Sequence, residues 1–338
     1  MSFHNLSISV LKVGRQLAGS LVVAAFLLLS ITSCLKEEDP IQPRPQGTLS
    51  TRTINLNQDY KYQIYYNIDQ DSIISQNDKS DWDLAFDANT EGSKVFLNPA
   101  KFMGAQKTNQ EDILSLKDTS GFASNRKVDA ANRPDSLALG SVKGLTKVYW
   151  IDRGYDEKGD PLDFVKVKFE SVNRQKYSFS VCKQGSTQVQ TYEINKDTTR
   201  NFVYFSFKTN AVANIEPNKN SWDMVFTQYI HYFNQPYQPY LVTGVLLNPS
   251  STYAAVDSTL AFSKIDKTMA ENFKLSQASD VIGYNWKEFG FGSSIYKIYS
   301  HYNYIIKNSK GTYFKMHFID FYDNKGTKGY PKFEFQRL

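Results

Sequence analysis

Cysteine and histidine are scarce in this chain of 338 residues. It contains two cysteines, Cys34 and Cys182, and four histidines. A disulfide framework requires several cysteine pairs, and a structural zinc site requires cysteines and histidines clustered at short spacing. The sequence has neither pattern. We therefore expect a hydrophobic core to provide the stability, for which 41% hydrophobic and 14% aromatic residues are sufficient.

Motifs of the common enzyme classes are also missing. The sequence contains no G-x-S-x-G nucleophile motif, no P-loop and no dinucleotide-binding fingerprint. Without Lys12 and Arg15, which belong to the amino-terminal segment described next, 37 basic residues face 34 acidic ones, a net charge of +3 spread without a basic block. We therefore expect a protein that is not an enzyme and that does not bind nucleic acid.

The amino terminus is typical of a bacterial lipoprotein. Lys12 and Arg15 precede an apolar run at residues 17–31, which is too short for a membrane-spanning helix and is flanked like a signal peptide. The run ends in ITSC, where an aliphatic residue and two small residues precede the cysteine. This order predicts that residues 1–33 are a signal peptide and that Cys34 is lipidated after cleavage. An ordinary signal peptide followed by a chance cysteine is the alternative.

Residues 34–49 predict a flexible tether. They are acidic at first and then rich in proline, with too few apolar residues to pack. The acidic cluster at residues 36–39 resembles the short signal that sends some Gram-negative lipoproteins to the outer face of the outer membrane, although a solvated linker would have the same composition. We expect a protein that is lipid-anchored in the cell outer membrane and exposed at the cell surface.

The remainder of the chain repeats itself. Four segments of the first half recur in the second half in the same order, which indicates a duplication followed by insertions in the loops. The pairs are YKYQIYYN (60–67) with NFVYFSFK (201–208), KSDWDLAF (79–86) with KNSWDMVF (219–226), KVFLNPA (94–100) with TGVLLNPS (243–250), and FVKVKFES (164–171) with YFKMHFID (313–320).

Each repeated segment is typical of a β-strand, because apolar and polar residues alternate and turn-forming residues punctuate the runs. A short helix is expected only within residues 268–277. The sequence therefore predicts an all-β fold, mostly antiparallel sheet, with two tandem modules at residues 50–196 and 197–338.

The recurring Trp-Asp pair, Trp82 with Asp83 and Trp222 with Asp223, predicts a structural role, because a single catalytic acid would not need duplicating. If the strand includes the pair, Trp82 shares one face with Phe86 while Asp83 lies on the other. The aspartates could then cap a neighbouring turn or accept backbone hydrogen bonds.

The second module resembles the HmuY family of haem-binding, hemophore-type surface lipoproteins. The resemblance is carried by YFSF (204–207), SWDMVFTQY (221–229) and the closing section at residues 296–335, and it covers essentially all of residues 197–338. The first module matches more weakly, through DWDLAF and VYWID. The lipoprotein signal agrees with this resemblance.

The resemblance implies an all-β core with two projecting loops, between which two axial side chains hold haem. The family's first ligand is expected within residues 267–285, where Met269 is the one soft iron ligand and Tyr284 the one phenolate candidate. The second is expected within residues 287–294, which contain neither histidine nor methionine. A bis-histidine site of the family's familiar kind is therefore not expected.

Aromatic residues around these positions could still contact the face of a porphyrin. Trp286, Phe289 and Phe291 are the candidates for such contacts. No confident metal ligand can be named from the sequence.

None of the histidines in the predicted modules matches a ligand position of the family. We interpret His231, which lies in an aromatic segment, as a strand residue, and His301 likewise. His317 corresponds in the repeat to Lys168, so we expect it to face solvent.

The resemblance implies surface capture of haem or a related porphyrin and its transfer to a TonB-dependent haem receptor in the outer membrane. The alternative is a non-haem surface lipoprotein of the same fold that acts in glycan binding or adhesion. For the alternative, the proline- and tyrosine-rich segment at residues 234–242 is where a species-specific contact would be sought.

Overall fold

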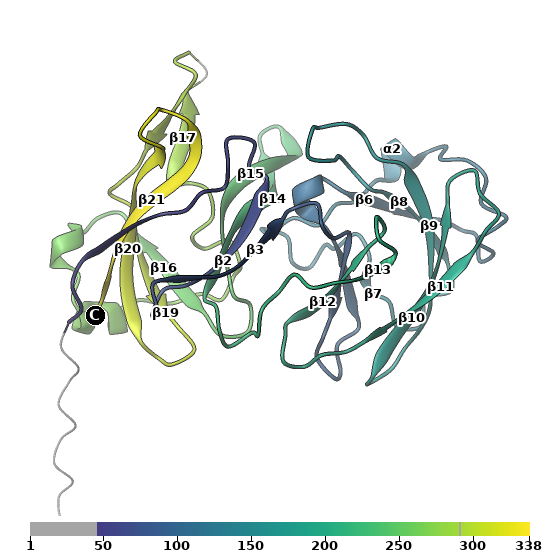
Figure 1. The fold of residues 1–338 in the computed structure, drawn as a ribbon, viewed down its shortest axis with the longest axis horizontal. Coiled ribbons are helices and arrows are strands. Elements are labelled where there is room, and N and C mark those ends of the chain that lie inside the picture. Colours follow the sequence, from purple (N-terminus) through teal and green to yellow (C-terminus); the bar gives the residue numbers. More distant parts are fainter. Residues whose placement is uncertain (1–45, 291) are drawn as a thin grey trace, which may run out of the picture. The chain divides into compact units, whose positions relative to one another are not determined.

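A computed structural model of the chain describes residues 46–290 and 292–338 (Figure 1). The predicted signal peptide, Cys34 and Phe291 therefore lie outside the described residues. Of the predicted tether, residues 46–49 are described, and the backbone N–H of Gly47 already donates to the carbonyl of Arg337 at 3.0 Å. In the described ranges, no helix is long and apolar enough to span a membrane.

Short strands joined by turns make up most of the described chain. The strands of the first half are β1 (Ser50–Thr53), β2 (Tyr62–Asn67), β3 (Ser72–Asp78), β4 (Leu84–Asp87), β5 (Lys94–Leu97), β6 (Gly104–Lys107), β7 (Gly140–Ser141), β8 (Val148–Asp152), β9 (Phe164–Val172), β10 (Lys176–Lys183) and β11 (Gln190–Asn195). Those of the second half are β12 (Phe202–Ser206), β13 (Ala211–Ala213), β14 (Met224–Asn234), β15 (Tyr237–Leu247), β16 (Tyr253–Asp257), β17 (Lys287–Gly290), β18 (Ile295–Ile298), β19 (Asn303–Lys307), β20 (Tyr313–Tyr322) and β21 (Lys328–Arg337).

The helices are short. They are the 3-10 turns η1 (Pro99–Lys101) and η2 (Phe262–Lys264) and the α-helices α2 (Phe122–Asn125) and α3 (Lys267–Asn272). The helix expected within residues 268–277 is therefore present as α3. It begins where Asp266 acts as N-cap, its carboxylate accepting the backbone N–H of Met269 at 2.8 Å.

The strands form two pairs of antiparallel sheets, which we call the first and second lobes. The first lobe contains the sheets β13-β12-β4-β5-β7 and β11-β10-β9-β8-β6, and the second contains β15-β14-β2-β3 and β1-β21-β20-β19-β16. The hairpin β17–β18 forms a small sheet of its own and projects from the second lobe (Figure 1). The predicted fold class, mostly antiparallel β, is confirmed.

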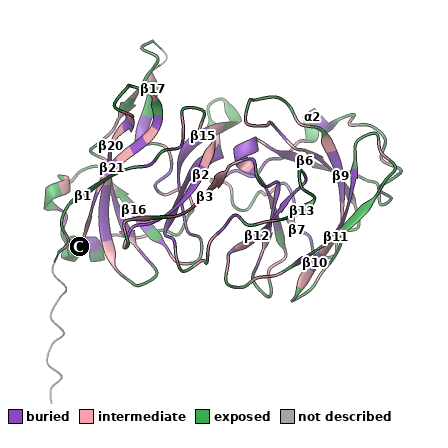
Figure 2. Ribbon diagram, in the orientation of Figure 1, coloured by how far each residue is buried: buried purple, intermediate pink, exposed green. Residues whose placement is uncertain are grey.

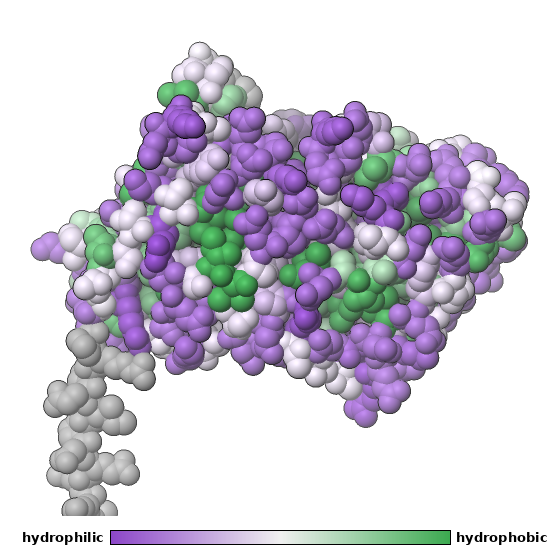
Figure 3. All heavy atoms as spheres, in the orientation of Figure 1, coloured by the Kyte–Doolittle hydropathy of each residue, from purple (hydrophilic) through white to green (hydrophobic). Residues whose placement is uncertain are grey.

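Each lobe has its own hydrophobic core between its two sheets, as in a β-sandwich. In the first lobe Phe86 of β4 packs against Tyr177 and Phe179 of β10, with ring centroids 5.1 and 5.3 Å apart. In the second lobe Phe226 of β14 stacks on Phe333 of β21 at 5.7 Å. Figure 2 shows buried residues along these strands, and the face seen in Figure 3 is largely hydrophilic with apolar atoms in separate groups.

The two repeats exchange strands: β1, β2 and β3 of the first repeat lie in the sheets of the second lobe, and β12 and β13 of the second repeat lie in a sheet of the first lobe. Strand β2 belongs to the first repeat but pairs with β14 of the second, and β12 of the second repeat pairs with β4 of the first. Each lobe is thus completed by strands from the other repeat, and the predicted boundary between residues 196 and 197 does not separate the sheets. The module boundaries themselves stay a prediction about the repeated units.

The expectation that Trp82 and Phe86 share a face is wrong. Strand β4 begins at Leu84, so the Trp-Asp pair precedes the strand and its alternation does not extend to Trp82. Trp82 packs with Tyr204 in a cluster between the lobes, whereas Phe86 lies in the core of the first lobe. The turn before β4 therefore directs the tryptophan toward the lobe interface.

Candidate functional site

The aspartate of each Trp-Asp pair accepts a backbone hydrogen bond from the residue next to an exchanged strand of the other repeat. The Oδ2 of Asp83 accepts the backbone N–H of Phe207 at 2.6 Å, and the Oδ2 of Asp223 accepts that of Ile68 at 2.9 Å. The two residues are 0% and 2% exposed. Because a buried carboxylate with an N–H donor is strongly favoured over an unpaired one, these bonds fix where β12 and β2 end.

The asparagine of each Leu-Asn-Pro segment makes the same two hydrogen bonds to the turn that contains the Trp-Asp pair. The Nδ2 of Asn98 donates to the carbonyl of Trp82 at 2.8 Å and to that of the residue three positions earlier at 2.7 Å. The Nδ2 of Asn248 makes the same two bonds at the same distances, with Trp222 in place of Trp82. The asparagines of the Leu-Asn-Pro segments thus fix the conformation of the two turns, and these turns place both tryptophan side chains between the lobes.

The two tryptophans each meet a tyrosine from the opposite repeat. Trp82 contacts Tyr204 edge to face, with centroids 4.8 Å apart at 77°, and Trp222 contacts Tyr65 at 4.9 Å and 82°. All four side chains are buried in one cluster. We call this cluster the aromatic floor, because a cavity lies above it. Edge-to-face pairs of this kind contribute about 0.5–1.5 kcal/mol each beyond their buried area.

The two repeats differ in the charged groups around the aspartate of the Trp-Asp pair. Asp83 pairs with the buried ammonium of Lys101, and the Nε of Arg153 lies 3.7 Å from its Oδ1. Asp223 has no ion pair among the described residues, and burial raises its pKa to about 6. Burial likewise lowers the pKa of Lys101. The first repeat therefore has a buried charge pair where the second has a lone carboxyl.

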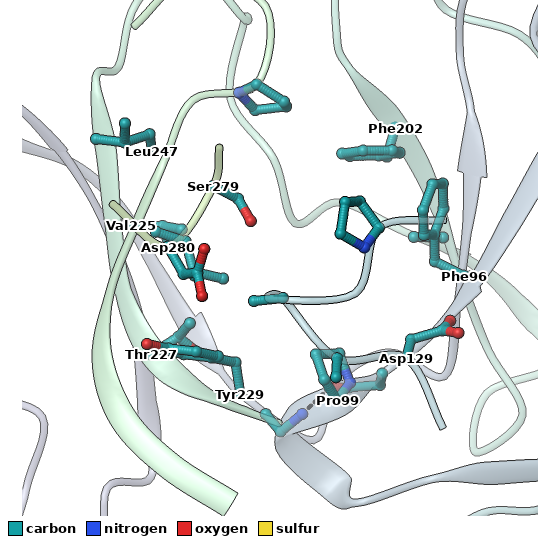
Figure 4. Close-up of a pocket in the computed structure, with 18 of the residues that line it drawn as sticks. Phe96, Pro99, Asp129, Phe202, Val225, Thr227, Tyr229, Leu247, Ser279 and Asp280 are labelled. Carbon is teal, nitrogen blue, oxygen red and sulfur yellow. Dashed lines mark hydrogen bonds between the residues drawn. The ribbon is translucent and has the colours of Figure 1, made fainter. Parts of the chain in front are cut away.

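A cavity of about 650 Å³ lies between the lobes, and we call it the interlobe cavity (Figure 4). This volume lies within the usual range for small-molecule sites, about 300–1,000 Å³. Phe96 and Phe202 line one side, and Val225 and Leu247 the other. The remaining lining includes the aromatic floor, both Leu-Asn-Pro segments and the loops at residues 129–134 and 277–280.

A few polar groups face this apolar space. The Ser279 hydroxyl and the Asp280 carboxylate point into the cavity from the second-lobe side, across from Phe96 and Phe202 (Figure 4). On the first-lobe side Asp129 accepts the backbone N–H of Leu97 at 2.7 Å, and burial raises its pKa to about 6. The cavity can therefore hold a flat apolar molecule and presents polar groups from both lobes.

The residues predicted to contact haem do not converge on one site. Met269 lies on α3, which packs beside Tyr313 at the start of β20, and its side chain is exposed. Phe289 lies on β17 of the projecting hairpin, whose Tyr296 N–H donates to the hydroxyl of Tyr322 at the end of β20. A ten-residue strand spans about 30 Å, so these two candidates lie near opposite ends of the second lobe.

The other two described candidates lie elsewhere again. Trp286 is 1% exposed and stacks on Phe318 at 3.9 Å, so its ring is part of the second core. Tyr284 is half-buried with its ring 5.0 Å from that of His231. None of the four lines the interlobe cavity.

Two of the histidines differ from expectation. His317 does not face solvent, because η2 covers it: its ring stacks on Phe262 at 4.1 Å and its Nε2 lies 3.0 Å from a carboxylate oxygen of Glu334. His301 is exposed in the turn between β18 and β19 and is not in a strand. His231 does lie in a strand, β14.

The iron of haem does not fit the lining of the interlobe cavity. No histidine, methionine or cysteine lies among the described residues that line it, and no cluster of metal-binding side chains is found in those ranges. Tyrosine could bind iron as a phenolate, but burial raises the pKa of Tyr65 and Tyr204 well above the usual value. Cys182 is free but is buried in the first lobe.

Comparisons with known proteins bear on the second repeat most directly. The model described as HmuY protein matches residues 198–335. No curated protein matches the chain.

Two solved structures match most of the chain at low sequence identity. The apo HmuY analogue of Tannerella forsythia is 11% identical, with 89% of this chain and 99% of that chain covered and a TM-score of 0.34. Apo PinO from Porphyromonas gingivitis is 9% identical, with 86% and 98% covered and a TM-score of 0.32. The match of the HmuY family model to residues 198–335 confirms the resemblance of the second module.

Proposed function

We propose that this chain is a lipid-anchored surface protein that captures haem or a related porphyrin in the interlobe cavity and passes it to an outer-membrane receptor. The observation that carries the proposal is a cavity of about 650 Å³ walled by aromatic side chains from both repeats of a chain whose residues 198–335 match the HmuY family model. Because its lining has no suitable iron ligand, the ring would be held by contact of its faces with the walls. Affinity would then depend little on the metal.

A titration with and without metal tests this proposal. Haemin and metal-free protoporphyrin should each quench the fluorescence of the floor tryptophans saturably, with dissociation constants within about threefold of each other, less than 1 kcal/mol apart. Binding of haemin alone, with the spectrum of a six-coordinate iron, would contradict contact-only binding. No saturable quenching by either compound would exclude porphyrin as the ligand.

A matched pair of variants locates the binding. Ala278 is exposed on the cavity rim, so Ala278→Trp should narrow the opening and weaken both porphyrins by about tenfold or more, as the loss of about 1.4 kcal/mol would. Ala261 is equally exposed but does not line the cavity, so Ala261→Trp should bind like the parent chain. Equal affinities for the two variants would place the porphyrin elsewhere.

A sugar ring of a glycan is the second candidate ligand. It is favoured by one observation: Ser279 and Asp280 point into the cavity opposite aromatic rings (Figure 4). Aromatic faces contact the apolar side of a sugar, while hydroxyl and carboxylate groups bond to its hydroxyls. Saturable quenching by oligosaccharides but by neither porphyrin, with Asp280→Asn weakening it, would select this alternative.

A further inference from the structure

Two loops border the interlobe cavity, and both reach the side chain of His231. The first rim loop, residues 129–134, comes from the first lobe, and the second rim loop, residues 277–283, comes from the second. The Nε2 of His231 lies 3.3 Å from the Nδ2 of Asn132, and its Nδ1 lies 3.7 Å from a carboxylate oxygen of Asp280. One imidazole therefore meets both sides of the rim, within hydrogen-bond distance of Asn132 and just beyond it from Asp280.

The amide of Asn132 is held in one orientation. Its Oδ1 accepts the backbone N–H of Tyr232 at 3.0 Å, and its Nδ2 donates to the carbonyl of Tyr232 at 3.0 Å. A flipped amide would lose both bonds, so the NH2 group must face His231. The Nε2 of His231 is thus the acceptor. The imidazole proton then lies on Nδ1, which faces Asp280.

The surroundings of His231 contain few other charged or titratable groups. Tyr284 contacts the ring at 5.0 Å, and Tyr240 is the cross-strand partner of His231 in β15. On the opposite face of the hairpin, the guanidinium of Arg133 is engaged by the rings of Tyr232 and Tyr237, at 4.8 and 4.7 Å.

Two carboxyl groups belong to the rim loops themselves. Asp280 is the one that faces the imidazole, whereas Asp129 is turned to the backbone N–H groups of Leu97 and Ala138. Burial raises the pKa of Asp129 to about 6, close to that of a histidine, so the effects of the two groups must be separated by experiment.

Protonation of His231 would break its hydrogen bond with Asn132. A protonated imidazole donates from both nitrogens, so Nε2–H would face the NH2 group of Asn132, donor against donor. The contact with Asp280 would become an ion pair and tighten. The first rim loop would then keep its backbone bond from Ala131 N–H to the Ile230 carbonyl, at 3.0 Å, and the two bonds of Asn132 to the Tyr232 backbone, but lose its link through His231 to the second rim loop.

We infer that His231 is a pH-sensitive latch: neutral, it links the two rim loops, and protonated, it uncouples the first rim loop from the second and so allows the interlobe cavity to open. The inference rests on the proposed function only for its consequence, which is release of the bound ligand in acid.

The sign of the pH effect follows from burial. Burial lowers the pKa of His231 below its ordinary 6.5, with Asp280 opposing in part. The folded chain then binds fewer protons than the unfolded chain between the two values, so this contribution to stability is present at neutral pH and is lost as the pH falls. The latch is therefore closed at neutral pH and opens as the pH falls through the lowered pKa of folded His231, which lies below 6.5.

Hydrogen–deuterium exchange of the ligand-free protein tests the latch directly. Between about pH 7.5 and about pH 5.5, and after correction for the intrinsic rate, amides of residues 129–134 should lose about tenfold in protection, the factor expected for one hydrogen bond. Amides of residues 277–283 should keep theirs. Unchanged protection of the first rim loop would overturn the inference.

Two substitutions separate His231 from Asp129. His231→Gln supplies a neutral acceptor for Asn132 and an amide donor for Asp280, so it should hold the loop at both pH values. His231→Lys carries a permanent donor and should release the loop at both. His317→Gln, a change far from the cavity, should exchange like the parent chain. Loss of protection in acid that persists in His231→Gln would assign the effect to Asp129 and contradict the latch.

Measuring porphyrin binding at both pH values distinguishes the latch from the proposed function. If protoporphyrin binds at neutral pH, its affinity should fall in acid for the parent chain and stay constant for His231→Gln. Exchange data that show the latch while no ligand binds would leave the latch standing and remove the proposed function. Binding of protoporphyrin with no change in exchange would overturn the latch and leave the proposed function standing.

Discussion

Residues 50–196 and residues 197–338, produced as two separate chains, should each remain unfolded, and the native lobes should form only when the two are mixed. The reason is the exchange of strands: β2 on the first fragment has its partner β14 on the second, and β12 on the second has its partner β4 on the first. Each fragment alone would expose an unpaired strand edge and half of the aromatic floor.

Circular dichroism and proton NMR of each fragment, and of the equimolar mixture, measure this outcome. As a control, a nick at an exposed turn within one lobe, such as Asp156–Gly159, should leave a folded complex, because no sheet depends on continuity there. A fragment that showed a cooperative unfolding transition on its own would mean that β2 or β12 can pair within its own repeat.

Replacing Asp83 with alanine should destabilise the chain far more than the equivalent change at Asp223. Asp83→Ala leaves the ammonium of Lys101 buried without its partner, and breaking a buried ion pair costs about 3–5 kcal/mol. Asp223→Ala leaves only the N–H of Ile68 unpaired, which costs about 1–3 kcal/mol. Urea unfolding at neutral pH compares the two free energies of unfolding.

A second variant identifies the cause of the difference. Asp83→Ala combined with Lys101→Met removes the unpaired charge together with its partner, so most of the extra loss should be recovered. Equal losses for Asp83→Ala and Asp223→Ala, or no recovery in the double variant, would show that the ion pair contributes nothing beyond the hydrogen bond.

Strand content and the repeat could be predicted because both are local properties of the sequence. Alternation in segments such as residues 313–320 indicates a strand wherever that strand pairs. The choice of partner is not local. The strand after each Trp-Asp pair begins with a similar apolar triplet, Leu84–Phe86 or Met224–Phe226, so β2 would match either one, and only the three-dimensional arrangement decides.

The candidate site was harder to predict for a related reason. The predicted haem contacts, such as Met269 and Trp286, all lie in one repeat, whereas the cavity is formed by both. Its walls include Phe96 and Phe202, which belong to different repeats and meet only because β12 crosses into the first lobe. The signal that could have found them is the repeated Trp-Asp and Leu-Asn-Pro pattern, read as one interface.

The exchanged strands also constrain how the two repeats can evolve. A recombination event that copied the coding segment of one repeat alone would separate strands from their pairing partners, so we expect the two repeats to be kept together. Substitutions in β2 meet their neighbours in β14, 155 or more positions away, as the bond from Ile68 to Asp223 illustrates. Across tandem chains of this kind, compensating changes should therefore run between repeats rather than within them.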